Sequence, residues 1–358
     1  MLKEVVGLLT ERQLLILETI IRDYTDLGQP IGSKTLQEQL PIRVSSATIR
    51  NEMAVLEKQG FITKEHSSSG RIPSLKGYRY YVDNLVKPVK IDSKSVRSIQ
   101  SLFGNEYRRV DEIIEMSAKI LSDLTNYTAI TLRPEASDLK LEGFRMVPLG
   151  NGQVMVILVA SDGSVESQIY NLPNNIDGES LEAVIRLIND KLVGSSLSEV
   201  TSKLQELQPL LTKYIEKSDG FIDVFGGILD KAIKEQFYIG GRRNLLNFAN
   251  GNNLEQIKSL YSLIDDESDK IGGLVDNTTN PHDHHGISVK IGDEMSDRLL
   301  LDYSLVSATY NVGSHGRGMI AILGPTNMPY SKMIGLVEVF QKELTKKLID
   351  YYRNFDKG

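Results

Sequence analysis

The pair Arg50-Asn51, two positions after Thr48, carries hydrogen-bonding groups that suit the edges of base pairs. In the major groove of DNA, arginine can pair with guanine and asparagine with adenine. We therefore predict that Thr48, Arg50 and Asn51 contact bases. Phosphates of the DNA backbone need only a cation or a hydroxyl donor, and nearby residues supply both. The predicted phosphate contacts are Ser33, Lys34, Ser46 and Lys58.

These side chains need a helix that separates them from the protein interior. The sequence predicts one over residues 47–59, begun by Ser45 or Ser46 and ended by Gly60. Spacings of four and three give it an apolar stripe of Ile49, Met53 and Leu56. Its opposite face is short and polar, with Ala47, Arg50, Asn51 and Ala54. An ordinary amphipathic helix with a solvated outer face would show the same pattern. The helix alone therefore does not distinguish a DNA-binding helix from a surface helix.

Two further helices are predicted before this one. Thr10 and Gln13 form a capping-box pattern in front of an apolar-periodic segment that ends near Gly28. After a turn at residues 29–32, Ser33 is expected to cap a second, short helix. Proline cannot continue a helix, so this second helix ends at Pro41.

A short hairpin is predicted directly after the third helix. Residues 61–66 form the first strand, residues 67–70 a tight turn and residues 71–73 the returning strand. Pro73 should end the pairing, because it has no N–H to donate. Three helices followed by a hairpin is the order of a winged helix, a relative of the helix-turn-helix. We predict that Arg71 leads the tip into a minor groove, the alternative being a generic surface turn.

The charge of the chain agrees with a nucleic-acid partner only locally. The whole chain has a net charge of −6. Between Pro41 and Val82, seven Lys and Arg residues stand against three Glu residues, a local charge of +4. A basic element on an acidic body is typical of a DNA-binding module joined to a regulatory domain, although a solvated surface would look similar.

Four blocks in this N-terminal part resemble the signature of the HrcA family of heat-inducible transcription repressors. They are residues 28–36 (GQPIGSKTL), 46–53 (SATIRNEM), 66–74 (HSSSGRIPS) and 77–83 (GYRYYVD). Later blocks are also similar to the family, at residues 286–292, 303–313 and 318–330. The resemblance thus covers most of the chain, and the loop 276–285 shows no family pattern.

The resemblance implies an α+β, multidomain fold. Its parts would be an N-terminal winged helix-turn-helix, a GAF-like α/β domain, and an α/β dimerising domain inserted into the GAF-like one. The expected borders are 1–88 for the winged helix, 89–143 and 223–358 for the GAF-like segments, and 144–222 for the insertion.

The pattern of elements after residue 88 suits an insertion. Pro88 lies in a predicted hinge, and residues 93–126 are predicted to be helical. Strands are predicted at 127–132, 139–149, 153–161, 165–172, 287–291, 300–310 and 318–323. Helices are predicted at 179–235 with two interruptions, at 253–265, and from Ser331 onward. Strands, then helices, then strands indicate an antiparallel sheet interrupted by an insertion, and Asn151-Gly152 and Asp162-Gly163 are hairpin turns within it.

The same resemblance implies the biological role. The operator would be an inverted repeat upstream of chaperonin and chaperone operons. The chaperonin GroEL would keep the repressor active, and heat would relieve repression because unfolded proteins occupy the chaperonin. A homodimer is expected as well, since two winged helices on a twofold axis can read an inverted repeat that one alone cannot.

Other chemistries have little support. The chain has no cysteine, which excludes disulfides, thiolate-bound zinc and a cysteine nucleophile, and fits a reducing cytoplasm. We see no signal-peptide pattern at the start, and the longest apolar run, Val154–Ala160, is too short to cross a membrane. His282–His285 (HDHH) is the only dense set of potential metal ligands, and we interpret it as part of a polar loop.

Two glycine-rich segments could bind anions, but we favour other interpretations for both. Residues 313–318 lack the Lys-Ser/Thr ending of a phosphate-binding loop, so we predict a turn between strands. Residues 238–243 contain Arg242 and Arg243, for which a solvated loop or an interface is favoured over an anion site. No catalytic motif is present, and we predict no cofactor, no metal site and no enzymatic activity.

Two alternatives to this function stay open. In the first, the GAF-like domain holds a small effector that controls a winged-helix repressor, which a thermal-shift scan with small molecules would reveal. In the second, the winged helix binds another protein, which absence of salt-dependent DNA binding would support.

Overall fold

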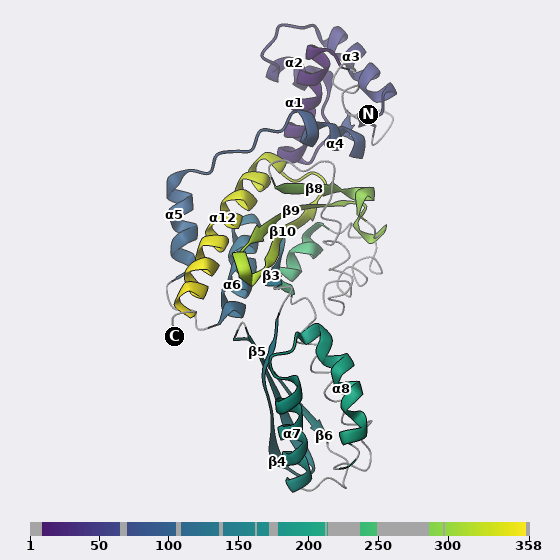
Figure 1. Cartoon of the computed structure of the whole chain (residues 1–358). Coiled ribbons are helices and arrows are strands. Elements are labelled where there is room, and N and C mark those ends of the chain that lie inside the picture. The colour runs from purple at the N-terminus through teal and green to yellow at the C-terminus, as the bar shows by residue number, and fades with distance from the viewer. Residues whose placement is uncertain are drawn as a thin grey trace.

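The computed structural model describes residues 9–64, 70–104, 109–135, 139–161, 163–171, 178–211, 213, 237–248, 286–295 and 298–355. Within these ranges helices are mixed with sheets of two, five and three strands, which confirms the predicted α+β class. Three regions follow one another along the molecule (Figure 1). We call them the head (residues 9–86), the sheet domain (residues 91–135 and 237–355) and the insert (residues 139–211), each meaning its described residues only.

The head is built from four helices and a short hairpin. These are α1 (Glu11–Leu27), α2 (Ser33–Gln39), α3 (Ser46–Lys58), β1 (Ile62–Thr63), β2 (Ile72–Pro73) and α4 (Leu75–Asn84). The predicted capping box of Thr10 and Gln13 is present, and Gly28 ends α1 with a left-handed φ of 64°. The prediction that Ser33 caps α2 was wrong. Gly32 occupies the N-cap position without a side-chain bond, and Ser33 lies inside the first turn.

The sheet domain contains one antiparallel sheet with the order β7-β3-β10-β9-β8. Its strands are β3 (Thr128–Glu135), β7 (Phe237–Gly240), β8 (Ile287–Ile291), β9 (Tyr303–Asn311) and β10 (Arg317–Pro325). β3 precedes the insert and β7 follows it, and the two strands pair directly, with Ala129 opposite Gly240. The predicted antiparallel sheet interrupted by an insertion is therefore confirmed.

Sequence patterns missed two features of this domain. For residues 238–243 a solvated loop or an interface was favoured, and the loop was wrong, because β7 and the 3-10 helix Arg242–Phe248 occupy this segment. The single helix expected over residues 93–126 is two helices, α5 (Ser93–Leu102) and α6 (Val110–Thr125). Gly104, with a φ of 58°, lies just after α5 and cannot continue a right-handed helix in that conformation.

Helices cover one face of the sheet. α6 and α12 (Tyr330–Phe355) pack on this face, and α5 packs against α12 (Figure 1). The opposite face of the sheet has a separate apolar cluster that includes Tyr303, Leu305 and Met319. Among the described helices, none has both the length and the apolar composition to cross a membrane.

The insert has a hydrophobic core of its own. Its elements are β4 (Leu141–Gly150), β5 (Gln153–Ala160), β6 (Val165–Asn171), α7 (Gly178–Leu192) and α8 (Leu197–Leu211). The buried residues of this core run from Leu141 to Leu211, and none of them belongs to the other described clusters. The β4–β5 turn is the predicted one, because Asn151 and Gly152 both have positive φ, at 51° and 72°.

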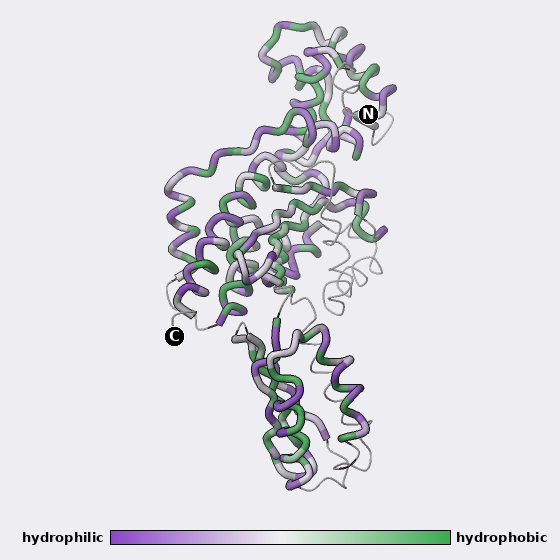
Figure 2. The backbone as a smooth tube through the Cα atoms, in the orientation of Figure 1, coloured by the Kyte–Doolittle hydropathy of each residue, from purple (hydrophilic) through white to green (hydrophobic). Residues whose placement is uncertain are grey.

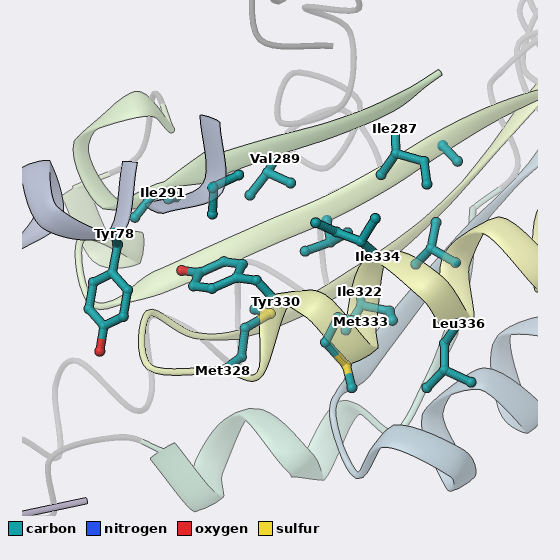
Figure 3. Close-up of a cluster of buried hydrophobic side chains, with 14 of the residues drawn as sticks. Tyr78, Ile287, Val289, Ile291, Ile322, Met328, Tyr330, Met333, Ile334 and Leu336 are labelled. Carbon is teal, nitrogen blue, oxygen red and sulfur yellow. The ribbon is translucent and has the colours of Figure 1, made fainter. Parts of the chain in front are cut away.

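The head and the sheet domain share one continuous hydrophobic cluster. Tyr78 of α4, Val289 and Ile291 of β8, and Tyr330 of α12 meet in it (Figure 3). Figure 2 shows that hydrophobic and hydrophilic residues alternate along the helices of both regions, as one-sided packing requires. The stretch around Pro88, predicted to be a hinge, is bonded to α12, since Ser331 Oγ donates to Lys87 O and Val89 N donates to Ser331 O at 2.9 Å.

Candidate nucleic-acid interface

The two faces predicted for α3 are present in the structure. Ile49, Met53 and Leu56 are buried, with exposed fractions of 0%, 4% and 0%. The opposite face is exposed and consists of Ala47, Arg50, Asn51, Ala54 and Lys58. Burial of the apolar stripe against α1 and α2 fixes how α3 lies in the head, and leaves Arg50 and Asn51 directed away from it.

Hydroxyl groups tie the start of α3 to α2. Ser45, rather than Ser46, is the N-cap, and its Oγ accepts a hydrogen bond from Thr48 N at 3.1 Å. Ser45 Oγ and Thr48 Oγ1 are 2.9 Å apart, and Ser46 Oγ lies 3.0 Å from Ser33 Oγ. A hydroxyl has one donor and two acceptor positions, so these contacts leave each group able to bond a further partner.

Three predicted cationic contacts are available to an anion. Lys34, Arg50 and Lys58 are exposed, and none forms an ion pair with a carboxylate of the described residues. Arg43, in the turn between α2 and α3, shares these properties and was not among the predicted contacts. The only signal for it in the sequence was its place in the basic stretch.

The hairpin lies against the C-terminal half of α3. Thr63 pairs with Ile72, and the backbone of Arg71 exchanges two hydrogen bonds with Ile31, at 2.8 and 2.9 Å. Ile31 comes so close that a Cβ on Gly70 would lie 2.5 Å from its backbone, which explains the glycine at that position. Residues 67–69 of the predicted turn 67–70, and residues 65 and 66 before them, lie outside the described residues.

Arg71 points to α3 in this structure. Its Nε and Nη2 lie 2.9 and 2.8 Å from Glu57 Oε2, and its side chain is 18% exposed. Lys64 of the hairpin's first side lies 3.6 Å from the other oxygen of Glu57. One carboxylate on α3 therefore interacts with both sides of the hairpin.

The other segments considered for chemistry do not add a site. Residues 313–315 form a 3-10 turn between β9 and β10, which confirms the prediction of a turn between strands. The described residues hold no group of three or more His, Asp or Glu side chains placed to bind a metal. His282–His285 and the predicted helix 253–265 lie outside the described residues.

Comparison with known proteins decides the family. A family model described as "HrcA protein C terminal domain" matches residues 111–334, more than half of the chain. The chain belongs to the HrcA family.

Relatives within the HrcA family extend over nearly the whole chain. The heat-inducible transcription repressor HrcA of Limosilactobacillus reuteri (strain DSM 20016) is 52% identical over 350 residues, covering 97% of this chain and 99% of that protein. The protein of the same name from Tetragenococcus halophilus is 47% identical over 350 residues, covering 98% and 99%. These relatives are named as repressors, which confirms the resemblance seen in the sequence and the prediction that the chain is not an enzyme.

A solved structure supports the fold. A crystal structure described as that of a hypothetical protein aligns with a TM-score of 0.59 at 22% sequence identity, covering 96% of this chain and 99% of that one. The similarity extends through head, sheet domain and insert, so this order of regions is shared.

Proposed function

We propose that this HrcA-family protein represses chaperonin and chaperone operons by binding an inverted-repeat operator as a homodimer. The observation that carries the proposal is the outer face of α3. That face presents Arg50 and Asn51 to solvent, and no carboxylate of the described residues neutralises Arg50. A helix that buries its apolar stripe and exposes base-pairing side chains suits the major groove.

Each predicted contact has a place in this proposal. Thr48, Arg50 and Asn51 contact base edges, and the phosphates on either side bind the remaining cations and hydroxyls of α2 and α3. These phosphate contacts are Ser33, Lys34, Ser46 and Lys58. Arg71 would enter a minor groove only after leaving Glu57, so its contribution to binding includes the loss of that ion pair.

The proposed domains rest on the resemblance to the HrcA family, and the separate cores and the sheet order support the division. Residues 1–88 form a winged helix, and residues 89–143 and 223–358 form a GAF-like domain. The dimerising insertion at 144–222 is supported by the separate core of the insert, which begins three residues earlier at Leu141. Asn189 of α7 strengthens that core, since its side chain bonds both the N–H and the carbonyl of Phe144 at 2.9 and 2.8 Å.

The insert also offers a surface for the second protomer. α7 and α8 cover one face of its sheet, and the other face carries apolar side chains that are 43% to 52% exposed. Among them, Val147 and Ile169 both pair with Met155 in the sheet register. A contiguous apolar face of this kind is typical of a protein–protein contact, and a twofold axis through it would join two identical faces.

The chaperonin circuit and the cytoplasmic location rest on membership of the HrcA family. In this proposal GroEL maintains the active repressor, and heat relieves repression when unfolded proteins compete for the chaperonin. The experiment is a fluorescence-anisotropy titration against a chaperonin-operator inverted repeat and a scrambled duplex, at two salt concentrations, with and without GroEL. Operator binding that is about a thousandfold tighter supports the proposal. Equal, weak binding to both duplexes in the presence of GroEL contradicts it.

A further inference from the structure

The contact between the head and the sheet domain contains one side chain with bonds to both. Arg79 of α4 donates from Nη2 to Asp83 Oδ1 at 2.6 Å, within its own helix. Its Nη1 donates across the junction to Val289 O at 2.7 Å and to Glu294 Oε2 at 3.1 Å. The side chain is only 15% exposed, so these bonds are largely shielded from water.

Both acceptors on the sheet domain are fixed in place. Val289 lies in β8, which is the edge strand of the described sheet, so Arg79 bonds a carbonyl on that free edge. The carboxylate of Glu294 also accepts a hydrogen bond from Ile291 N at 2.8 Å, at the end of the same strand. The guanidinium group is planar and its donors point in fixed directions, so three acceptors in set positions define its orientation.

The apolar part of the junction has less directional preference. Tyr78 and Tyr330 pack with ring centroids 5.9 Å apart, and Leu75 lies against Gly292 (Figure 3 shows the two tyrosines). Burial raises the pKa of Tyr78, so this phenol stays neutral. Hydrophobic contact stabilises the junction but depends mainly on buried area and little on angle. The angle between head and sheet domain therefore depends on the polar contacts.

We propose that Arg79, held by Val289 and Glu294, fixes the orientation of the head on the sheet domain and so determines which half-site spacing the dimer accepts. The inference rests on the proposed function. In a dimer, an inverted repeat is bound tightly only when both α3 helices reach their major grooves together. If the head turned freely, each half-site would still bind one head. Binding of the first head would then increase the affinity of the second head for its half-site less. Arg79 is thus a positioning residue, since it faces the sheet domain and not DNA.

The test compares three duplexes by anisotropy titration of the full chain. They are the inverted repeat, a single half-site, and the inverted repeat with its spacer lengthened by about five base pairs, which is half a turn. For R79A we expect half-site affinity within about twofold of the unmodified protein. We expect the affinity for the inverted repeat to fall about tenfold or more, and its advantage over the lengthened repeat to shrink by a similar factor.

Two further variants make the result interpretable. R22A removes the same charge from an exposed position on α1, where Arg22 lies 3.4 Å from Asp23 of the same helix, and should leave the spacing preference unchanged. E294Q alters the sheet-domain side of the contact with little change of volume, and should reduce the spacing preference in the same direction as R79A. It keeps the inference testable if R79A does not fold.

The possible results separate the inference from the proposed function. An unchanged spacing preference in R79A and E294Q overturns the inference, as does loss of half-site affinity together with repeat affinity in both. Failure of the unmodified protein to prefer the operator over a scrambled duplex would contradict the proposed function instead.

Discussion

The head and the insert are attached to the sheet domain in opposite ways. The head shares a hydrophobic cluster with α12 and β8 and has polar bonds across the junction through Arg79, and Ser331 of α12 bonds Lys87 directly after the head. The insert has a closed core of its own, and backbone bonds such as Leu197 N to Leu139 O at 2.7 Å join its elements to one another and not to the sheet domain. Stability and orientation of the head therefore depend on the sheet domain, whereas the insert can fold and present its outer face independently.

Truncation in the two cores should give the largest difference. We expect F144A to destabilise the insert by about 3–5 kcal/mol, since Phe144 is fully buried there, and to leave the head unaffected. The matched variant F340A, at a fully buried position of α12 in the shared cluster, should destabilise sheet domain and head together. Hydrogen exchange resolved by region measures the destabilisation in both variants. Loss of protection in α1–α4 of F144A would contradict the independence of head and insert.

A charge on the outer face of the insert tests its proposed role in dimerisation. V147D should raise the dimer dissociation constant about 100-fold, or about 2.7 kcal/mol, because a carboxylate would be buried without a partner. V193D is a close control, since Val193 is also 43% exposed but lies at the end of α7, away from that face. Sedimentation velocity over a concentration series gives the constants, and equal behaviour of the two variants would exclude this face as the dimer contact.

The outer face of α3 should affect DNA specificity and not stability. R50A should cost about 1–3 kcal/mol in operator binding and blur the sequence preference. K58A should weaken binding to all duplexes alike and reduce the slope of log affinity against log salt by about one. Titrations with operator and scrambled duplex at several salt concentrations separate the two effects. An unchanged operator-to-scrambled ratio in R50A would show that α3 does not read sequence.

The ion pairs of Glu57 should give the smallest effect. E57A removes the carboxylate that interacts with Arg71 and Lys64, and so removes a negative charge from near the predicted DNA contacts of the head. Partly exposed ion pairs contribute little to stability, so we expect less than about 1 kcal/mol of destabilisation. Binding to any duplex should become about two- to fivefold tighter at low salt. Weaker binding would instead assign Glu57 a role in holding the hairpin in its binding position.

Sequence patterns predicted the elements whose signals are local. The capping box at Thr10, the Asn151-Gly152 turn and the two faces of α3 depend on residues within a few positions of one another. The strand that was missed, β7, depends on a distant partner. β7 exists because Phe237–Gly240 pairs with β3, more than one hundred positions earlier, and a short strand containing glycine has little signal of its own.

In the candidate site, too, the sequence predicted the local features and not the contacts between different elements. Exposure of Arg50 and Asn51 follows from the helical period, which the sequence contains. The contact of Ser33 with Ser46, and that of Arg71 with Glu57, join residues 13 and 14 positions apart on different elements. These contacts result from the packing of α2 and the hairpin on α3. No pattern of residue types in the sequence predicts that packing.

The junction between head and sheet domain has a consequence for the order of events during synthesis. The head is complete once residue 84 has been made, but β8 and α12, which cover Tyr78, come more than two hundred residues later. A ribosome adds about 5–20 residues each second, so a folded head would wait on the order of ten seconds or more with this apolar surface in water. β3 waits for β7 over a shorter interval. Long-range contacts of this kind slow folding and prolong exposure of apolar surface, so the newly made chain passes through a period of high aggregation risk before its last helix is formed.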